Sequence, residues 1–105
     1  MSLRRVVLPE AVEELLDAVA WYEERRAGLG AELFGVVDAG MVWVCSSPMA
    51  GAAWPDLPRY RRLVLQRFPD VLVYEVRGEE VEFVAVAHTR RKPGYWTDRI
   101  RTRRT

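Results

Sequence analysis

The spacing of hydrophobic positions changes twice along this chain, and these changes predict the order of its secondary structure. Residues 3 to 8 are rich in valine and leucine and stop at Pro9, which predicts a short strand. Two stretches with apolar residues at three- and four-residue spacing follow, and each predicts an amphipathic helix. Three valine-rich segments separated by turn residues come last and predict strands.

The first helix is predicted to begin at Pro9, because proline suits a first helical turn. Gly28 can adopt the left-handed conformation that ends a helix. Trp21 flanks the apolar stripe of this helix. The stripe is expected to face the core and consists of Val12, Leu15, Leu16, Val19 and Tyr22.

The second helix is predicted to follow the short loop 27–30 and to end at Ser46-Ser47-Pro48, so that the two helices form a hairpin. Gly35 and Gly40 lie inside it and each costs about 1 kcal/mol relative to alanine, which indicates close helix packing at these positions. Its expected buried face consists of Leu33, Phe34, Val37, Met41, Val44 and Cys45.

The second half of the chain predicts a three-stranded antiparallel meander over residues 60–68, 71–77 and 81–88. Residues 48–58 contain three prolines and are predicted to form a loop without helix or strand. In the middle strand Leu72, Tyr74 and Val76 share the face expected to pack on the helices, and Val71 and Val73 share the opposite face. The predicted fold class is therefore α+β, in the order β-α-α-β-β-β, with a helical hairpin packed on one face of a mainly antiparallel sheet.

The length and composition predict one domain over residues 1–98, followed by a basic tail over residues 99–105 that is expected to fray. One cysteine, Cys45, and one histidine provide neither an internal disulfide nor a set of zinc ligands, so no metal or cofactor is expected. We find no apolar run of about 20 residues and no secretory signal, which predicts a cytoplasmic protein without a membrane partner.

The charge is strongly segregated although the chain as a whole carries only +1. Residues 1–58 hold nine acidic residues against four arginines, whereas residues 88–105 hold seven basic residues against Asp98 alone. A basic face of this kind attracts phosphates or an acidic protein partner.

The segment 88–96 concentrates an imidazole, three cations, a phenol and an indole, contributed by His88, Arg90, Arg91, Lys92, Tyr95 and Trp96. Cations neutralise phosphates and flat rings stack on unpaired bases, so the segment is a candidate nucleic-acid contact. A structural interpretation is equally open, in which the rings pack over the sheet and the histidine binds backbone.

The order and spacing of several motifs resemble the RelE/ParE family of type II toxins over nearly the whole chain. The motifs are Trp21-Tyr22-Glu23, Gly28-Leu29-Gly30, Tyr60-Arg61-Arg62, Phe68-Pro69, Tyr74-Glu75-Val76, Ala85-Val86-Ala87-His88-Thr89-Arg90-Arg91 and Gly94-Tyr95-Trp96. The resemblance implies a small toxin that a cognate antitoxin protein neutralises, in a toxin–antitoxin hetero-oligomer.

The family has two activities, and the resemblance points to both. RelE-like members cleave messenger RNA on the ribosome with sheet arginines and a tyrosine after the last strand. Here Tyr95 matches that tyrosine and Arg61 and Arg62 match basic positions on the first meander strand, but Val71 stands where the middle-strand arginine is expected. Thr89 is nearest to the position of the late arginine, with Arg90 and Arg91 beside it. This departure favours the ParE-like activity, which is directed at DNA gyrase and needs no catalytic set.

The two activities give the candidate residues different roles. In a nuclease, His88 could transfer a proton, Tyr95 could donate one once cations lower its pKa, and Arg90 and Arg91 could clamp the phosphate. Arg61, Arg62, Lys92 and Trp96 are candidates for binding the substrate or target, and Val71 and Val73 for facing the antitoxin. A third alternative is a non-toxic protein or nucleic-acid interaction module on the same fold.

Overall fold

The computed structural model describes residues 2–104, and the side chains of residues 2–100. The chain forms β1 (Arg4–Val7), α1 (Pro9–Arg25), α2 (Leu29–Ser46), β2 (Ala52–Trp54), β3 (Leu57–Val64), β4 (Asp70–Arg77), β5 (Glu80–His88) and α3 (Thr97–Arg104). The predicted order of strand, helical hairpin and meander is confirmed.

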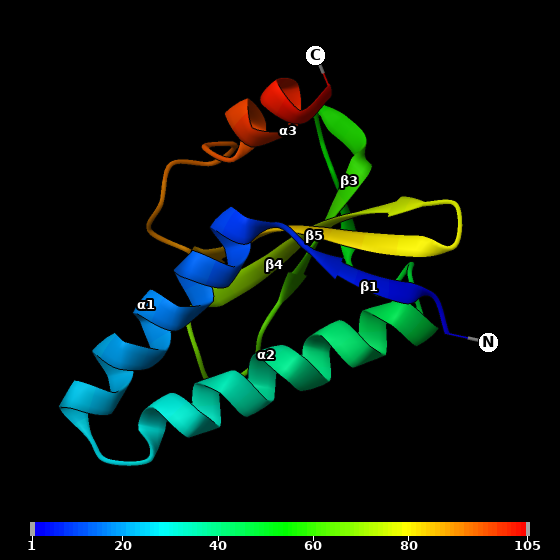
Figure 1. The fold of residues 1–105 in the computed structure, drawn as a ribbon. Coiled ribbons are helices and arrows are strands. Elements are labelled where there is room, and N and C mark those ends of the chain that lie inside the picture. Colours follow the sequence, from blue (N-terminus) through cyan, green and yellow to red (C-terminus); the bar gives the residue numbers. More distant parts are fainter. Residues whose placement is uncertain (1, 105) are drawn as a thin grey trace.

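The strands form one sheet in the order β1-β5-β4-β3-β2. β1 is parallel to β5, and the other neighbouring strands are antiparallel. α1 and α2 cover one face of the sheet, and α3 lies across the other face (Figure 1). The predicted α+β class, with a hairpin of helices on a mainly antiparallel sheet, is therefore confirmed.

The sheet separates the core into two clusters, and a β-bulge in β5 changes which of its residues face each cluster. Val73 pairs with Ala85 and Tyr74 pairs with Phe83, so Val84 is an extra residue in β5. Leu72, Tyr74 and Phe83 belong to the cluster under the helices, whereas Val73, Val84 and Ala85 belong to the cluster on the α3 side. The alternation predicted for Leu72, Tyr74 and Val73 is therefore correct, while the exposed Val76 contributes to neither cluster.

Gly30 and Glu23 hold the two helices together at their connection. A Cβ atom on Gly30 would lie 2.5 Å from the carbonyl oxygen of Val19, so only glycine allows the helices to approach this closely. The Glu23 carboxylate accepts hydrogen bonds from the backbone N–H groups of Gly28 and Gly30, each at 2.9 Å. It thereby satisfies N–H groups at the start of α2 that have no partner within the helix.

The apolar stripe predicted for α1 is partly wrong. Val12 and Leu16 are 40% and 56% exposed, whereas Ala11 is fully buried. The face that packs on the sheet also includes the partly buried Glu14, a polar residue whose hydrogen bonds are satisfied there. A hydrophobicity pattern cannot show such a position, because it assigns every carboxylate to the solvent.

The buried face of α2 agrees with the prediction except at Phe34, which is 49% exposed. Gly40 is in close contact with the sheet and not with α1, since a Cβ atom there would lie 3.2 Å from Leu65 and Leu72, and Gly35 has no neighbour within 4 Å. By length and composition α2 is apolar enough to cross a membrane, but in this fold seven of its residues are buried in the protein core.

Two short elements were not predicted. β2 lies within the segment expected to be a loop and pairs with Arg61 and Arg62 of β3. α3 occupies residues expected to form a fraying tail, so the predicted domain boundary at residue 98 falls inside a helix. Both elements depend on distant residues: Tyr74 accepts a hydrogen bond from the N–H of Gly51 beside β2, and Trp96 anchors the start of α3.

Candidate functional site

The segment between β5 and α3 forms a compact loop that its own backbone holds in place. The N–H of Arg91 bonds to the carbonyl oxygen of His88, and that of Tyr95 bonds to the carbonyl oxygen of Lys92. Gly94 has a φ of 80°, a conformation that glycine adopts without strain. The loop therefore presents its cations and rings in a defined arrangement.

This loop separates two hollows on the protein surface. The first hollow has a volume of about 390 Å³ and lies between α1 and the end of β5; the second has a volume of about 280 Å³ and lies on the α3 side of the sheet. His88, Arg91 and Tyr95 line both.

The first hollow combines aromatic, acidic and basic side chains. Its lining contains Glu14, Asp17, Ala18, Trp21, Tyr22, Asp70, Val86, His88, Arg90, Arg91 and Tyr95. The structure thus brings together the four residues proposed for a nuclease and adds three carboxylates that the sequence analysis did not include.

Glu14 is the centre of a hydrogen-bond network that joins α1, β5 and α3. Its carboxylate accepts the hydroxyl of Tyr95, two N–H groups of Arg99 at 2.7 and 2.9 Å, and the backbone N–H of Val86 at 3.0 Å. Arg99 also donates to the carbonyl oxygen of Val84 in the β-bulge. Because β1 pairs with β5 only as far as Phe83, this network satisfies backbone groups of β5 beyond the parallel pairing.

The environment of Tyr95 contradicts the expectation that neighbouring cations lower its pKa. Burial raises the pKa of Tyr95, and so do the hydrogen bond to Glu14 and its negative charge; the charges of Arg99 and Arg91 offset these effects only in part. Tyr95 is therefore a weaker acid than an ordinary tyrosine, and its proton is already donated to a carboxylate.

His88 lies at the end of β5 directly opposite Asp70 of β4. Its Nδ1 atom accepts a hydrogen bond from the backbone N–H of Arg90 at 3.0 Å. The histidine thus has the backbone contact of the structural interpretation, while its ring still lines both hollows.

The second hollow has an apolar floor and a basic rim. Val64, Val71 and Ala87 contribute to the floor, and Arg62, Arg91 and Lys92 are exposed cations around it. Val71 and Val73 both line this hollow; Val71 is partly buried and Val73 is 1% exposed. That these two valines face the antitoxin stays a prediction.

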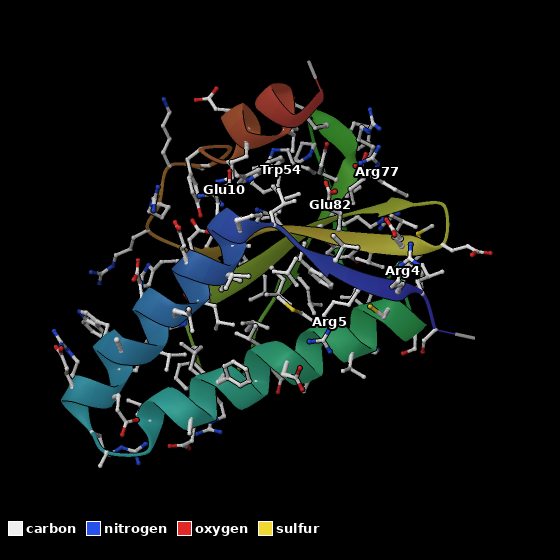
Figure 2. The ribbon with its side chains drawn as sticks, in the orientation of Figure 1. Arg4, Arg5, Glu10, Trp54, Arg77 and Glu82 are labelled. Carbon is white, nitrogen blue, oxygen red and sulfur yellow. The ribbon has the colours of Figure 1, made fainter. Side chains whose placement is uncertain are left out.

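Trp96 belongs to the same core cluster as Val73. This tryptophan is itself 1% exposed and contacts Trp54 and Tyr60, with ring centroids 5.2 Å apart in each pair. Trp54 lies on the side of the sheet that α3 covers (Figure 2). Trp96 is therefore part of the core in this structure, and its role in binding a target stays a prediction.

Arg61 and Arg62 point to opposite faces of the sheet. Arg61 donates to the carbonyl oxygen of Gly51 at 2.7 Å, on the side where Tyr74 holds the loop before β2. Arg62 lies over the ring of Trp54 at 5.4 Å and lines the second hollow. Arg61 thus does not join the cations of the 88–96 loop, whereas Arg62 does.

Glu14 and Asp70 are the principal site residues that the sequence analysis missed. Glu14 precedes its partners by more than 70 positions, and no local pattern connects them. Asp70 lies outside the predicted strands 60–68 and 71–77, although it begins β4 and is 3% exposed. Among residues 2–104 no group of three or more His, Cys, Asp or Glu side chains is arranged to hold a metal ion.

Comparison with known proteins identifies the fold. No family model matches the chain, and no curated protein matches it significantly. Among solved structures, the chain is similar to one described as the chromosomal ParDE TA system from P. aeruginosa, with a TM-score of 0.72 and 17% sequence identity over 83% of this chain and 96% of the other. The protein therefore has a ParE-like fold, which confirms the resemblance found in the sequence at the level of the fold.

Proposed function

We propose that the protein is the toxin of a type II toxin–antitoxin system and that it acts on DNA gyrase through a binding surface, without catalysing a reaction. The ParE-like fold supports the toxin class. The observation that carries the choice of target is the hydrogen bond from Tyr95 to Glu14, because it ties up the proton that a nuclease would deliver to its leaving group.

The distribution of the cations supports the same choice. Arg61 is held on the helix side of the sheet by Gly51, and no cation stands at Val71 in the middle strand. Cleavage of RNA needs several cations around one phosphate, whereas binding to a protein or to a protein–DNA complex needs only a complementary surface.

A cognate antitoxin is the second partner in this proposal. The second hollow offers an apolar floor with Val64 and Val71 inside a rim of Arg62, Arg91 and Lys92. This chemistry fits an acidic amphipathic segment, whose apolar side chains enter the hollow and whose carboxylates pair with the rim. Binding there covers part of the 88–96 loop and so accounts for neutralisation in the cytoplasm.

RelE-like cleavage of messenger RNA on the ribosome is the second candidate function. One observation favours it: His88, Arg90, Arg91 and Tyr95 line a single hollow. In this alternative the hydrogen bond between the Tyr95 hydroxyl and Glu14 must break when the protein binds the ribosome.

The experiment that tests the proposal compares the two targets with the same purified protein. The protein is added to DNA gyrase with relaxed plasmid, and in parallel to translating ribosomes whose messages are mapped for cleavage. We expect supercoiling to be inhibited and the messages to stay intact, with activity restored by the antitoxin. Codon-phased cuts with normal supercoiling would overturn the proposal in favour of the second candidate, and no effect in either assay would favour a non-toxic interaction module.

A further inference from the structure

Asp70 is a buried carboxylate whose surroundings do not satisfy it. Its side chain is 3% exposed, and Oδ2 has no hydrogen-bond partner among the residues that the structure describes. Burial raises the pKa of Asp70, and the nearby His88 offsets this effect only in part. Native proteins pair nearly all buried polar atoms, so a carboxylate left in this state indicates a site with a ligand.

The position of Asp70 in the first hollow gives such a ligand access. The volume of this hollow, about 390 Å³, lies within the size range of known ligand sites. Of the three carboxylates in the lining, Glu14 is already bound to Arg99 and Tyr95, which leaves Asp70 in the hollow and Asp17 on exposed α1 surface. These two acids favour a cationic group next to them, and Arg90, which lines the same hollow, can pair with an acidic group of the same ligand.

The aromatic residues of the hollow show which kind of cation fits. The guanidinium of Arg25 lies 3.6 Å from the centre of the Trp21 ring, and that of Arg91 lies 3.9 Å from the centre of the Tyr95 ring. Both rings thus attract guanidinium groups, because cation–π attraction and planar stacking act together.

A nucleotide fits the same hollow less well. A phosphate close to Asp17 or Asp70 would experience like-charge repulsion. Next to Asp17 and Asp70 the hollow therefore favours a guanidinium over a phosphate.

We propose that the first hollow is a binding site for an arginine side chain of a partner protein, with Asp70 as the acceptor that pairs with its guanidinium and Asp17 as a second acid at the rim. Neither the ParE-like fold nor the choice of gyrase as target requires this site. A partner that uses it presents an exposed arginine, together with an acidic residue that can pair with Arg90.

The test uses L-arginine amide as the probe and L-citrulline amide as an uncharged control of almost the same shape. Each is titrated into the isotope-labelled full chain while the backbone amide signals are followed by NMR. We expect L-arginine amide to shift the signals of Asp70, Val86 and His88 with a dissociation constant on the order of 1 mM, as befits a single side chain. L-citrulline amide is expected to bind at least about tenfold more weakly, because a charge-assisted hydrogen bond is lost.

Asp70→Asn provides the decisive variant, since it keeps the shape of the side chain and removes its charge. We expect it to lower the affinity for L-arginine amide at least about tenfold, whereas Asp56→Asn at an exposed position outside the hollow leaves it unchanged. Equal shifts by both amides, or unchanged binding to a folded Asp70→Asn variant, would overturn the proposal. Guanosine monophosphate shifting these signals while L-arginine amide does not would overturn it in favour of a nucleotide site. These results are independent of any toxin activity, so a failure here leaves the proposed function standing.

Discussion

The hydroxyl group of Tyr95 donates a hydrogen bond to the carboxylate of Glu14, a residue 81 positions earlier in the chain. This contact joins the loop after β5 to α1, and Arg99 in α3 binds the same carboxylate. Glu14 and Arg99 are both 16% exposed, so their ion pair is largely shielded from water. The network fixes the end of the chain on the sheet and determines what Tyr95 can do chemically.

We expect Glu14→Gln to lower the free energy of unfolding by about 2–3 kcal/mol. The neutral amide cannot accept all four hydrogen bonds, and Arg99 is left largely buried without its counter-charge. Urea unfolding measures the change, and Glu13→Gln, on an exposed neighbour in α1, is the matched control. A loss as small as that of the control would show that the network does not stabilise the fold.

The burial of Trp96 predicts that α3 depends strongly on this side chain. Trp96→Ala should cost about 3–5 kcal/mol, because a fully buried ring is replaced by a cavity next to Trp54 and Tyr60. Hydrogen exchange should show the loss first in α3 and β2. Exchange that is unchanged in α3 would mean that the helix is held by other contacts.

The partial burial of Tyr22 predicts a smaller effect. Its ring packs edge to face on Trp21 and Phe68, with centroids 5.0 and 5.1 Å apart. Tyr22→Ala should therefore cost about 2 kcal/mol, which is less than a fully buried aromatic residue. An unchanged melting temperature in Tyr22→Ala would show that the packing of this part of α1 has been assigned wrongly.

The buried carboxyl group of Asp70 should make the stability of the protein depend on pH. Because its pKa is raised in the folded protein, its contribution to stability is fully present below the ordinary aspartate value and is lost as the pH rises through the folded-state pKa. Asp70→Asn should therefore stabilise the protein at pH 7, by on the order of 1 kcal/mol, and the gain should shrink as the pH falls toward about 3. An equal gain in stability at both pH values would contradict the raised pKa of Asp70. Asp56→Asn controls for the general loss of a negative charge.

These results show which parts of the structure a sequence pattern can predict. The strand, the helical hairpin and the meander follow from apolar spacing and turn residues, because their signals are local. β2 has three residues and forms only through pairing with Arg61 and Arg62, and α3 lacks an apolar stripe and depends on Trp96 and Arg99. Contacts between distant residues determine both, so no local pattern could predict them.

The candidate site likewise has features with a local sequence signal and features that depend on distant contacts. The 88–96 loop was recognisable because its charges and rings are close in sequence, and Arg62 joins it in space. Glu14 and Asp70 were not, since their roles come from burial and from partners on other elements. The pKa of Tyr95 was predicted to shift in the wrong direction, because the sequence shows the neighbouring arginines but not the carboxylate of Glu14.

The effect of Tyr95→Phe on the two activities tests the central claim most directly. The substitution keeps the ring and its packing and removes the hydroxyl, at a cost of about 1 kcal/mol for the lost hydrogen bond, which a melting curve measures separately. We predict that growth arrest and inhibition of supercoiling survive in Tyr95→Phe with messages intact, whereas replacing both Arg90 and Arg91 by alanine weakens target binding and its dependence on salt. Codon-phased cleavage of messages that falls by roughly 10² to 10⁴ in Tyr95→Phe would contradict the account, because a loss of that size is what removal of a general acid produces.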